Sequence, residues 1–226
     1  MDNWALRMAG GYGRLRMVEW LAEHFDLTTA DARANDNQAL RDACARGHLA
    51  TARYLVKRFA LTVADARAED NEALREACAG GHLATVQWLA EHFGLTAADA
   101  RTWNNRALQV ACAGGHQAIA RWLVKYFDLT ADDVRADDSW ILRVTCRNGH
   151  AATAQWLVAQ FRLTAADASA DANYALRWAC CNGHTAIVQW LAAHFGLTAA
   201  ADDNNYARLA QAIPWRSPSG SRVLYK

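Results

Sequence analysis

Histidine, cysteine and arginine each recur in this 226-residue chain at intervals of 34 residues, and each could do chemistry if clustered. A metal site needs three or four ligands that converge on one ion. The histidines instead occur once per interval, each after a glycine at an expected helix start. This pattern favours a structural hydrogen-bonding role over metal ligation and predicts no metal site. The histidines are His48, His82, His116, His150 and His184.

Five of the six cysteines share one position of the same interval, and no CxxC pair occurs. Equivalent positions of adjacent units lie side by side, too far apart for regular disulfide geometry. We therefore interpret them as small buried side chains in a reducing compartment, with Cys181 as an accessible exception. The first residues, Met1–Arg7, are already in repeat register, which argues against a removable leader. We expect an intracellular protein, cytoplasmic or nuclear.

An arginine column could hold phosphate, but arginines bonded to carbonyl groups or to a neighbouring unit's aspartate are the favoured interpretation. We find no nucleophile–base motif, paired carboxylates or phosphate loop, and Gly10-Gly-Tyr-Gly is too short for one. The sequence therefore predicts neither enzyme activity nor a cofactor. The column consists of Arg7, Arg41, Arg75, Arg143 and Arg177, with Gln109 in one unit.

Net charge and hydropathy exclude some classes of partner. The chain has 24 basic and 23 acidic residues, a net charge of +1, so no overall field attracts polyanions. No run approaches the 18 apolar residues that a membrane span requires. A fixed interval of 34 residues indicates a stacked-repeat architecture, in which each unit contacts only its neighbours. The units are residues 2–35, 36–69, 70–103, 104–137, 138–171 and 172–203, a half unit 204–212 and a tail 213–226.

Each unit is expected to contain two principal helices and a short third one. In the second unit the first helix follows Asn37, a good N-cap, and ends at Gly47. The second helix runs from His48 to about Phe59. Thr62 and Asp65 have capping-box spacing, which predicts a short helix from the threonine onward. Arg14 and Arg16 suggest that the first unit ends the stack as a polar cap.

The segment Ala-Leu-Arg-x-Ala-Cys-x-x-Gly-His, followed by an apolar helix, resembles the ankyrin repeat along nearly the whole chain. Leu40, Ala43, Cys44, Gly47 and His48 match family positions. The chain lacks the family's Thr-Pro pair, has 34 residues per unit rather than 33, and replaces the β-hairpin finger with the short helix. It looks like the divergent type common in large DNA viruses and unicellular eukaryotes. The resemblance implies an all-α solenoid without catalytic activity that recognises proteins through its concave side.

Two variable columns, four residues apart, share one face of the first helix, away from its inward Ala/Leu/Ala/Cys stripe. In the resembled fold this face lines the concave groove. One column reads Trp4, Gln38, Glu72, Arg106, Trp140, Tyr174, Tyr206, and the other reads Met8, Asp42, Glu76, Val110, Val144, Trp178, Ala210.

We favour tryptophans outside the second-helix column as interface anchors; the alternative is that these rings pack against their neighbours or the C-terminal tail. The second-helix column itself (Trp20, Tyr54, Trp88, Trp122, Trp156, Trp190) is assigned to the core. The predicted partner-binding residues are Asp42, Glu72, Glu76, Trp103, Arg106, Val110, Trp140, Val144, Tyr174, Trp178 and Tyr206.

Three functions remain open at this point. The first is a non-enzymatic adaptor that binds a protein or peptide, with acidic residues attracting basic side chains and an aromatic anchor near Trp140 and Trp178. The second is a structural subunit of a larger assembly or a homodimer. The third is a modular nucleic-acid binder with bases stacked on aromatic rings, which the balanced charge disfavours.

Overall fold

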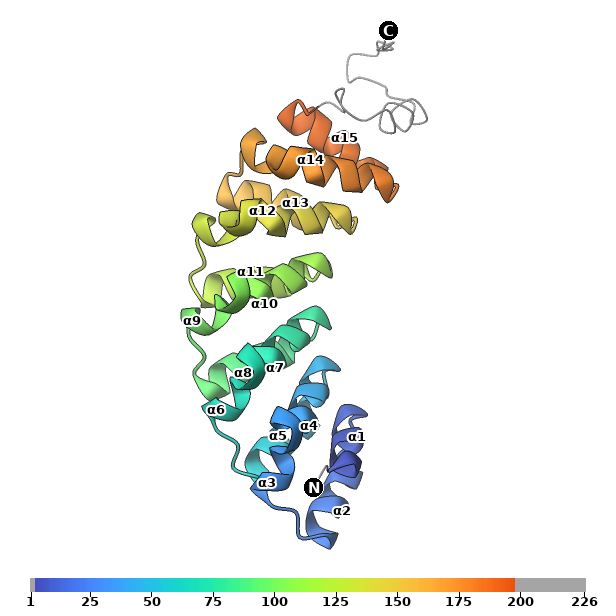
Figure 1. Ribbon diagram of the computed structural model, residues 1–226, viewed down its shortest axis with the longest axis vertical. Helices are drawn as coiled ribbons and strands as arrows, with labels where there is room; N and C mark the ends of the chain where they lie inside the picture. The colour runs from blue at the N-terminus through green and yellow to red at the C-terminus, as the bar shows by residue number, and fades with distance from the viewer. Residues whose placement is uncertain (1–2, 198–226) are drawn as a thin grey trace.

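A computed structural model describes residues 3–197, which form one curved stack of helices (Figure 1). Within this range the structure has fifteen helices and no strand, so the predicted all-α solenoid is confirmed. The predicted half unit 204–212, the tail 213–226 and the predicted site residue Tyr206 lie outside the described residues.

Each unit contributes a long first helix and a long second helix that run back to back. The first helices are α1 (Trp4–Gly11), α4 (Ala34–Ala45), α7 (Ala68–Ala79), α10 (Thr102–Ala113), α12 (Ala131–Arg147) and α14 (Ala165–Cys181). The second helices are α2 (Leu15–His24), α5 (Leu49–Arg58), α8 (Leu83–Phe93), α11 (Gln117–Tyr126), α13 (Ala151–Phe161) and α15 (Thr185–Phe195). The short helices are α3 (Thr29–Ala32), α6 (Val63–Ala66) and α9 (Ala97–Ala100), and their equivalents merge into α12 and α14.

The first helices of adjacent units pack closely along their lengths, whereas the second helices touch only sparsely. Small residues permit this approach, because Gly10 lies against Ala39 and Gly11 against Asp42. The first helices therefore form the closely packed side of the stack.

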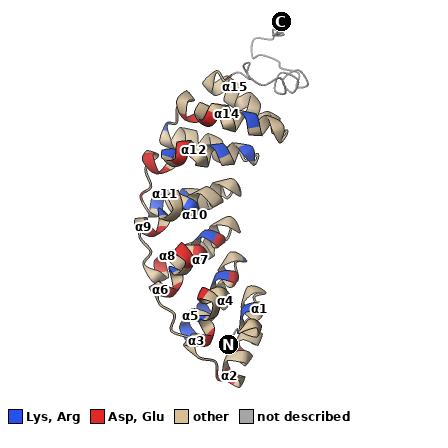
Figure 2. Cartoon of the chain, viewed as in Figure 1, with Lys and Arg blue, Asp and Glu red and all other residues tan. Residues whose placement is uncertain are grey.

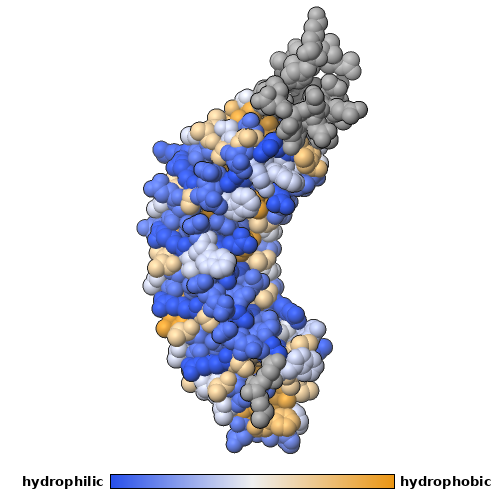
Figure 3. All heavy atoms as spheres, viewed as in Figure 1, coloured by the Kyte–Doolittle hydropathy of each residue, from blue (hydrophilic) through white to orange (hydrophobic). Residues whose placement is uncertain are grey.

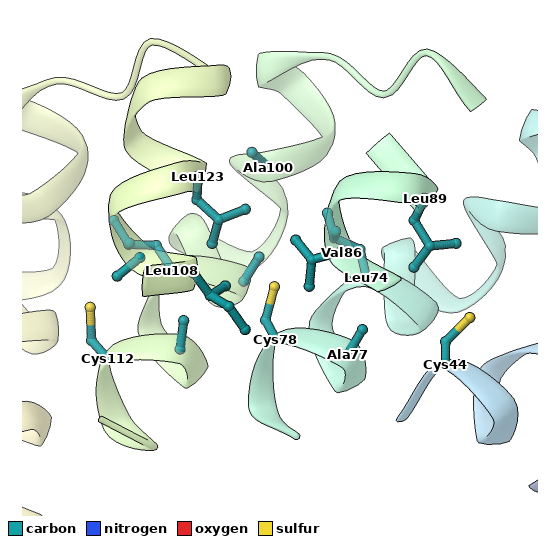
Figure 4. Packing of buried hydrophobic residues seen from close by; sticks show 14 of the residues in the cluster. Cys44, Leu74, Ala77, Cys78, Val86, Leu89, Ala100, Leu108, Cys112 and Leu123 are labelled. Carbon is teal, nitrogen blue, oxygen red and sulfur yellow. The ribbon is translucent and has the colours of Figure 1, made fainter. Parts of the chain in front are cut away.

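The core runs unbroken through the units. The predicted inward stripe of the second unit (Ala39, Leu40, Ala43 and Cys44) is fully buried, as are its counterparts in the third unit. Figure 4 shows Cys44, Cys78 and Cys112, each on its own helix, one per unit among leucine and valine side chains. Burial raises the pKa of these thiols and raises that of Cys146 to about 12, so they stay protonated and act as small apolar groups.

The short helices begin with the predicted capping boxes. In α6 the Thr62 backbone N–H and hydroxyl both donate to Oδ2 of Asp65, at 2.7 and 3.0 Å. The same arrangement starts α9 and α12, through Asp99 and Asp133. Each aspartate thus satisfies a backbone donor that the helix start leaves free.

The same aspartates also bind the preceding unit, through a set of ion pairs that we call the Arg–Asp ladder. Arg33 donates through Nε and Nη2 to the two oxygens of Asp65, at 2.7 and 2.9 Å. Figure 2 shows acidic and basic residues side by side at α6 and α9, where the ladder lies. The ladder consists of Arg33–Asp65, Arg67–Asp99, Arg101–Asp133 and Arg135–Asp167.

Burial by itself raises the pKa of Asp65 and Asp99, but the bonds from arginine and threonine outweigh it and lower each pKa to about 2. For Asp133 the hydrogen bond from Arg101 is the largest influence, and its pKa is also about 2. These carboxylates are therefore charged in the folded chain over most of the pH range.

The prediction that Asn37 is an N-cap is wrong. Asn37 has φ 61° and ends a left-handed turn of three residues, 35–37, which precedes the regular part of α4. Asn and Asp tolerate this conformation better than other non-glycine residues, and they fill eleven of the fifteen positions in the five such turns. The turns are residues 35–37, 69–71, 103–105, 137–139 and 171–173.

The arginine column holds these turns, as the sequence favoured. Nη2 of Arg75 donates to the Glu69 carbonyl at 2.9 Å, and Nη2 of Arg143 donates to that of Asp137 at 2.8 Å. Gln109, the exception in the column, donates to the Asn104 carbonyl instead. The column arginines therefore stabilise the turns by donating hydrogen bonds to backbone carbonyl groups.

The prediction that the second-helix aromatic column is core holds only for Trp156. Trp20 is 49% exposed and the other members are half-buried. The four partly exposed tryptophans stack on the residue four positions later, as Trp122 does on Tyr126, with centroids 4.4 Å apart. The sparse contact between second helices leaves these rings partly open to solvent.

The ladder predicts a loss of stability in acid. Because the folded pKa values lie below the unfolded value of about 3.9, the carboxylates stabilise the fold above about pH 4, and this contribution disappears as pH falls toward about 2. Asp99→Asn should lower the free energy of unfolding at neutral pH by about 1–3 kcal/mol and flatten its dependence on acid pH. Urea unfolding followed by circular dichroism measures both. Asp132→Asn, at an exposed position one residue before a ladder aspartate, is the control; equal effects of the two substitutions would contradict this role.

The Gly-His pairs predict a second difference in stability. Gly81 has φ 79°, and a Cβ there would lie 2.6 Å from Cε1 of His116 in the next unit. Gly94 is also left-handed, with φ 59°, but a Cβ there would meet nothing within 4 Å. Gly94→Ala should therefore cost about 1–2 kcal/mol, the penalty of the left-handed backbone alone, and Gly81→Ala clearly more. Thermal unfolding of the two variants measures the difference, and equal costs would show that the histidine contact is unimportant.

Candidate functional site

The predicted binding columns lie on the exposed surface of the first helices, which we call the first-helix face. Its positions are set by the left-handed turns, because each turn directs the chain into the next first helix. The residue that opens the turn, Glu69 in α7 or Trp103 in α10, therefore lies beside the variable columns. Both side chains are exposed.

A pocket of about 350 Å³ lies on this face between α7 and α10. Five of the eleven predicted partner-binding residues line it, so the structure brings together residues from two adjacent units. The sequence analysis missed the two other lining residues, Glu69 and Arg75, because neither belongs to a variable column of the first helix. The lining consists of Glu69, Glu72, Arg75, Glu76, Trp103, Arg106 and Val110.

Trp103 is the most exposed aromatic ring of this region, at 62%. Its indole Nε1 donates to Oδ2 of Asp70 at 2.9 Å, which fixes the ring's orientation. The guanidinium of Arg75 lies 4.8 Å from the ring centroid, in a cation–π contact. The ring is thus held in place by two neighbours while most of its surface stays open.

Some charged side chains of the pocket have a partner of opposite charge and others do not. Glu72 forms an ion pair with Arg41 of the preceding unit. In the described part of the chain Glu76 has no ion-pair partner, and its side chain is exposed. Arg106 makes one long hydrogen bond, 3.3 Å, to Gln109. The pocket therefore combines an open carboxylate with an aromatic surface, the chemistry that binds a cationic side chain.

A second group of predicted residues meets further along the face, on α12 and α14. The ring centroids of Trp140 and Tyr174 are 5.7 Å apart, and those of Tyr174 and Trp178 are 5.8 Å apart. The Arg143 guanidinium contacts the first two rings, and that of Arg147 lies 5.0 Å from Trp178. Trp140 and Tyr174 are half-buried, while Trp178 is 39% exposed. Both alternatives from the sequence therefore apply, internal packing to the first two rings and exposure to Trp178.

The remaining predicted residues are less prominent. Asp42 and Val144 are half-buried, and Asp42 lies against Gly11 of the first unit. Trp4 and Met8 occupy the same two columns but were not among the predicted site residues, although they are 62% and 36% exposed. Their position in the columns was the signal that could have identified them.

Two members of the histidine column contact backbone carbonyl groups. Nε2 of His116 lies 3.0 Å from the Ala79 carbonyl, and Nε2 of His184 lies 3.0 Å from that of Arg147. Across residues 3–197, no three His, Cys, Asp or Glu side chains are grouped so that they could hold a metal ion. Over the same residues, no helix is long and apolar enough to cross a membrane.

Comparison with known proteins agrees with this geometry. Residues 55–133 match a family model described as ankyrin repeats, in three copies. The structure is similar to the ankyrin repeat domain of human ASB11, with a TM-score of 0.61 and 19% identity over 88% of this chain and 87% of that one. It is also similar to an ankyrin repeat family protein from Legionella pneumophila, with a TM-score of 0.50 and 20% identity over 92% and 74%. At these identities the two structures show the fold alone. Among curated proteins, none matches the sequence.

Proposed function

We propose that this chain, whose residues 55–133 match ankyrin repeats and whose fold is similar to that of ankyrin repeat domains, binds a protein or peptide segment on its first-helix face. Ankyrin repeats are in general non-enzymatic modules of protein–protein interaction. The observation that carries the proposal is the pocket between α7 and α10, where variable positions of two units meet. In a stacked-repeat protein the repeated positions maintain the fold, so the variable ones are free to specify a partner.

The pocket suits a basic side chain of the partner. A lysine or arginine that enters beside Trp103 gains a cation–π contact with the ring and an ion pair with Glu76. Arg75 already covers one part of the ring, so the incoming cation occupies the open remainder. Val110 gives the pocket an apolar wall for the aliphatic part of such a side chain.

The aromatic group on α12 and α14 extends the same face. Trp178 offers an exposed ring, and its neighbours Tyr174 and Arg147 hold it from two sides. Rigidly held aromatic rings are typical of interface hot spots, because little side-chain entropy is lost on binding. A partner segment that lies across the units would thus place a basic residue near Trp103 and an apolar one near Trp178.

Nucleic acid fits this face less well. A groove that follows a phosphate backbone needs unpaired positive charge along its length. On this face Arg41 and Arg143 are paired with Glu72 and Asp171, and the pocket itself contains three glutamates. Protein or peptide is therefore the better supported partner.

Peptides selected from a random-sequence display library on the full chain test the proposal. We expect them to be rich in lysine or arginine, and Trp103→Ala should raise their dissociation constants by about tenfold or more, as removal of a hot-spot side chain does. Glu76→Lys should weaken the same peptides by repelling their charge. Fluorescence anisotropy with labelled peptides measures each affinity.

Tyr126→Ala provides the matched control, since it removes an exposed aromatic ring from a second helix rather than from the pocket. It should leave the affinities unchanged. Peptides that bind the Trp103→Ala and Glu76→Lys variants as well as the unaltered chain would overturn the proposal.

A further inference from the structure

The first-helix face repeats its side chains at a fixed interval, because α10, α12 and α14 pack against one another in order (Figure 1). Axes of packed helices lie about 8–10 Å apart, so equivalent positions of adjacent units are about 9 Å apart. One set of equivalent positions carries an apolar side chain on each of the three helices. We call it the apolar row, and it consists of Val110, Val144 and Trp178.

The apolar row begins at the pocket between α7 and α10, because Val110 lines that pocket together with Glu76 and Trp103. The two valines are half-buried, and Trp178 at the other end is 39% exposed. Figure 3 shows hydrophilic residues over most of the visible face along the middle of the stack, with small apolar areas between them. The row therefore offers separate apolar contacts, one per helix, in line with the pocket.

A polyproline II segment matches the interval of the row. This conformation has three residues per turn and rises about 3.1 Å per residue, so residues three apart lie on the same side, about 9 Å from each other. In a β-strand the residues on one side are two apart, about 6.6 Å, and they fall out of step with the units. A polyproline II segment can thus present one side chain to each unit.

Unused arginine donors on the face favour this conformation over an α-helix. Two turns of helix also span about 11 Å, but a helix bonds its own carbonyl groups. A polyproline II backbone has no internal hydrogen bonds, so its carbonyl groups accept bonds from outside. Within the described part of the chain, Arg106 makes one hydrogen bond, to Gln109, and Arg147 makes one, to the Tyr174 hydroxyl, each 3.3 Å long. A guanidinium has five N–H donors, so both arginines can still bind a partner's carbonyl groups.

We propose that the partner segment of this face adopts polyproline II and carries apolar residues three and six positions from a basic residue. This inference rests on the proposed function and specifies the ligand of the same site. The basic residue enters the pocket beside Trp103, the next contacts Val110 and Val144, and the last contacts Val144 and Trp178. The spacing is the same for both chain directions, because the period of three residues is unchanged when the segment is reversed.

The peptides selected on the full chain test this spacing first. When they are aligned on their basic residue, we expect an apolar residue three and six positions away on one side, with proline frequent between them. Basic peptides whose apolar residues show no preferred spacing, or the spacing of seven that an α-helix would need, would overturn the inference and leave the proposed function intact. A selection without basic peptides would instead contradict the proposed function itself.

Changes to the tightest-binding selected peptide test its conformation. One alanine inserted between the two apolar residues should raise the dissociation constant about tenfold, because the last side chain no longer faces Trp178. Proline at the positions between the three contact residues should preserve the affinity or increase it, since proline presets the polyproline II backbone. Loss of binding on proline substitution would show a helix or a strand and overturn the inference. Fluorescence anisotropy measures each affinity.

A double-mutant cycle tests the contact at the far end of the row. Trp178→Ala should weaken the selected peptide about tenfold. It should have little further effect on a peptide whose last apolar residue is replaced by alanine, because the two groups contact each other. Tyr126→Ala, on a second helix, should affect neither peptide. Equal weakening of both peptides by Trp178→Ala would show that the last residue lies elsewhere, and circular dichroism confirms that each variant is folded.

Discussion

One carboxylate in each of the second to fifth units serves two structural purposes, and the rest of the stack depends on it. In Asp65, Asp99 and Asp133 the group begins its own short helix and also receives two hydrogen bonds from an arginine of the unit before. The same carboxylate therefore couples the start of the short helix to the position of the preceding unit, because it accepts hydrogen bonds from both. At the start of the stack Asn3 takes the place of the arginine and bonds Asp31 at 2.8 Å. At the other end Ser169 stands where the arginine would be.

The left-handed turns place variable side chains at regular intervals on the surface of the stack. Four of the five turns begin two residues after a ladder arginine, and in four units the column arginine donates to the first carbonyl of the turn. Because the backbone of the turn is fixed by these bonds and by Asn or Asp residues, its opening side chain can change without loss of the fold. Tryptophan at this position in one unit and glutamate in another give the pocket its mixed character.

The repeat pattern of the sequence was sufficient to predict the helices, the capping boxes and the inward stripe, because each of these depends on residues close together in the chain. The left-handed turns were missed, since Asn37 suits an N-cap as well as a left-handed residue and only contacts with the next unit decide between them. Asn71, for example, donates to the Thr102 hydroxyl of that unit. The partial exposure of the second-helix tryptophans was missed for a similar reason, because it depends on how far apart those helices lie. Within the site, the variable columns identified five lining residues, but the contribution of Glu69 and Arg75 required the turn geometry.

The first-helix face offers aromatic rings held by arginines next to open carboxylates, a combination suited to one partner segment. A stacked fold makes this possible, because the repeated positions maintain the spacing of the units and leave the surface side chains free to vary.

Hydrogen exchange of the full chain, measured with and without a selected basic peptide, tests the central claim most directly. If the first-helix face is the binding surface, the peptide will slow exchange at the turns 69–71 and 103–105 and in α7 and α10, while α8 and α11 exchange as before. Slower exchange confined to the second helices would contradict it.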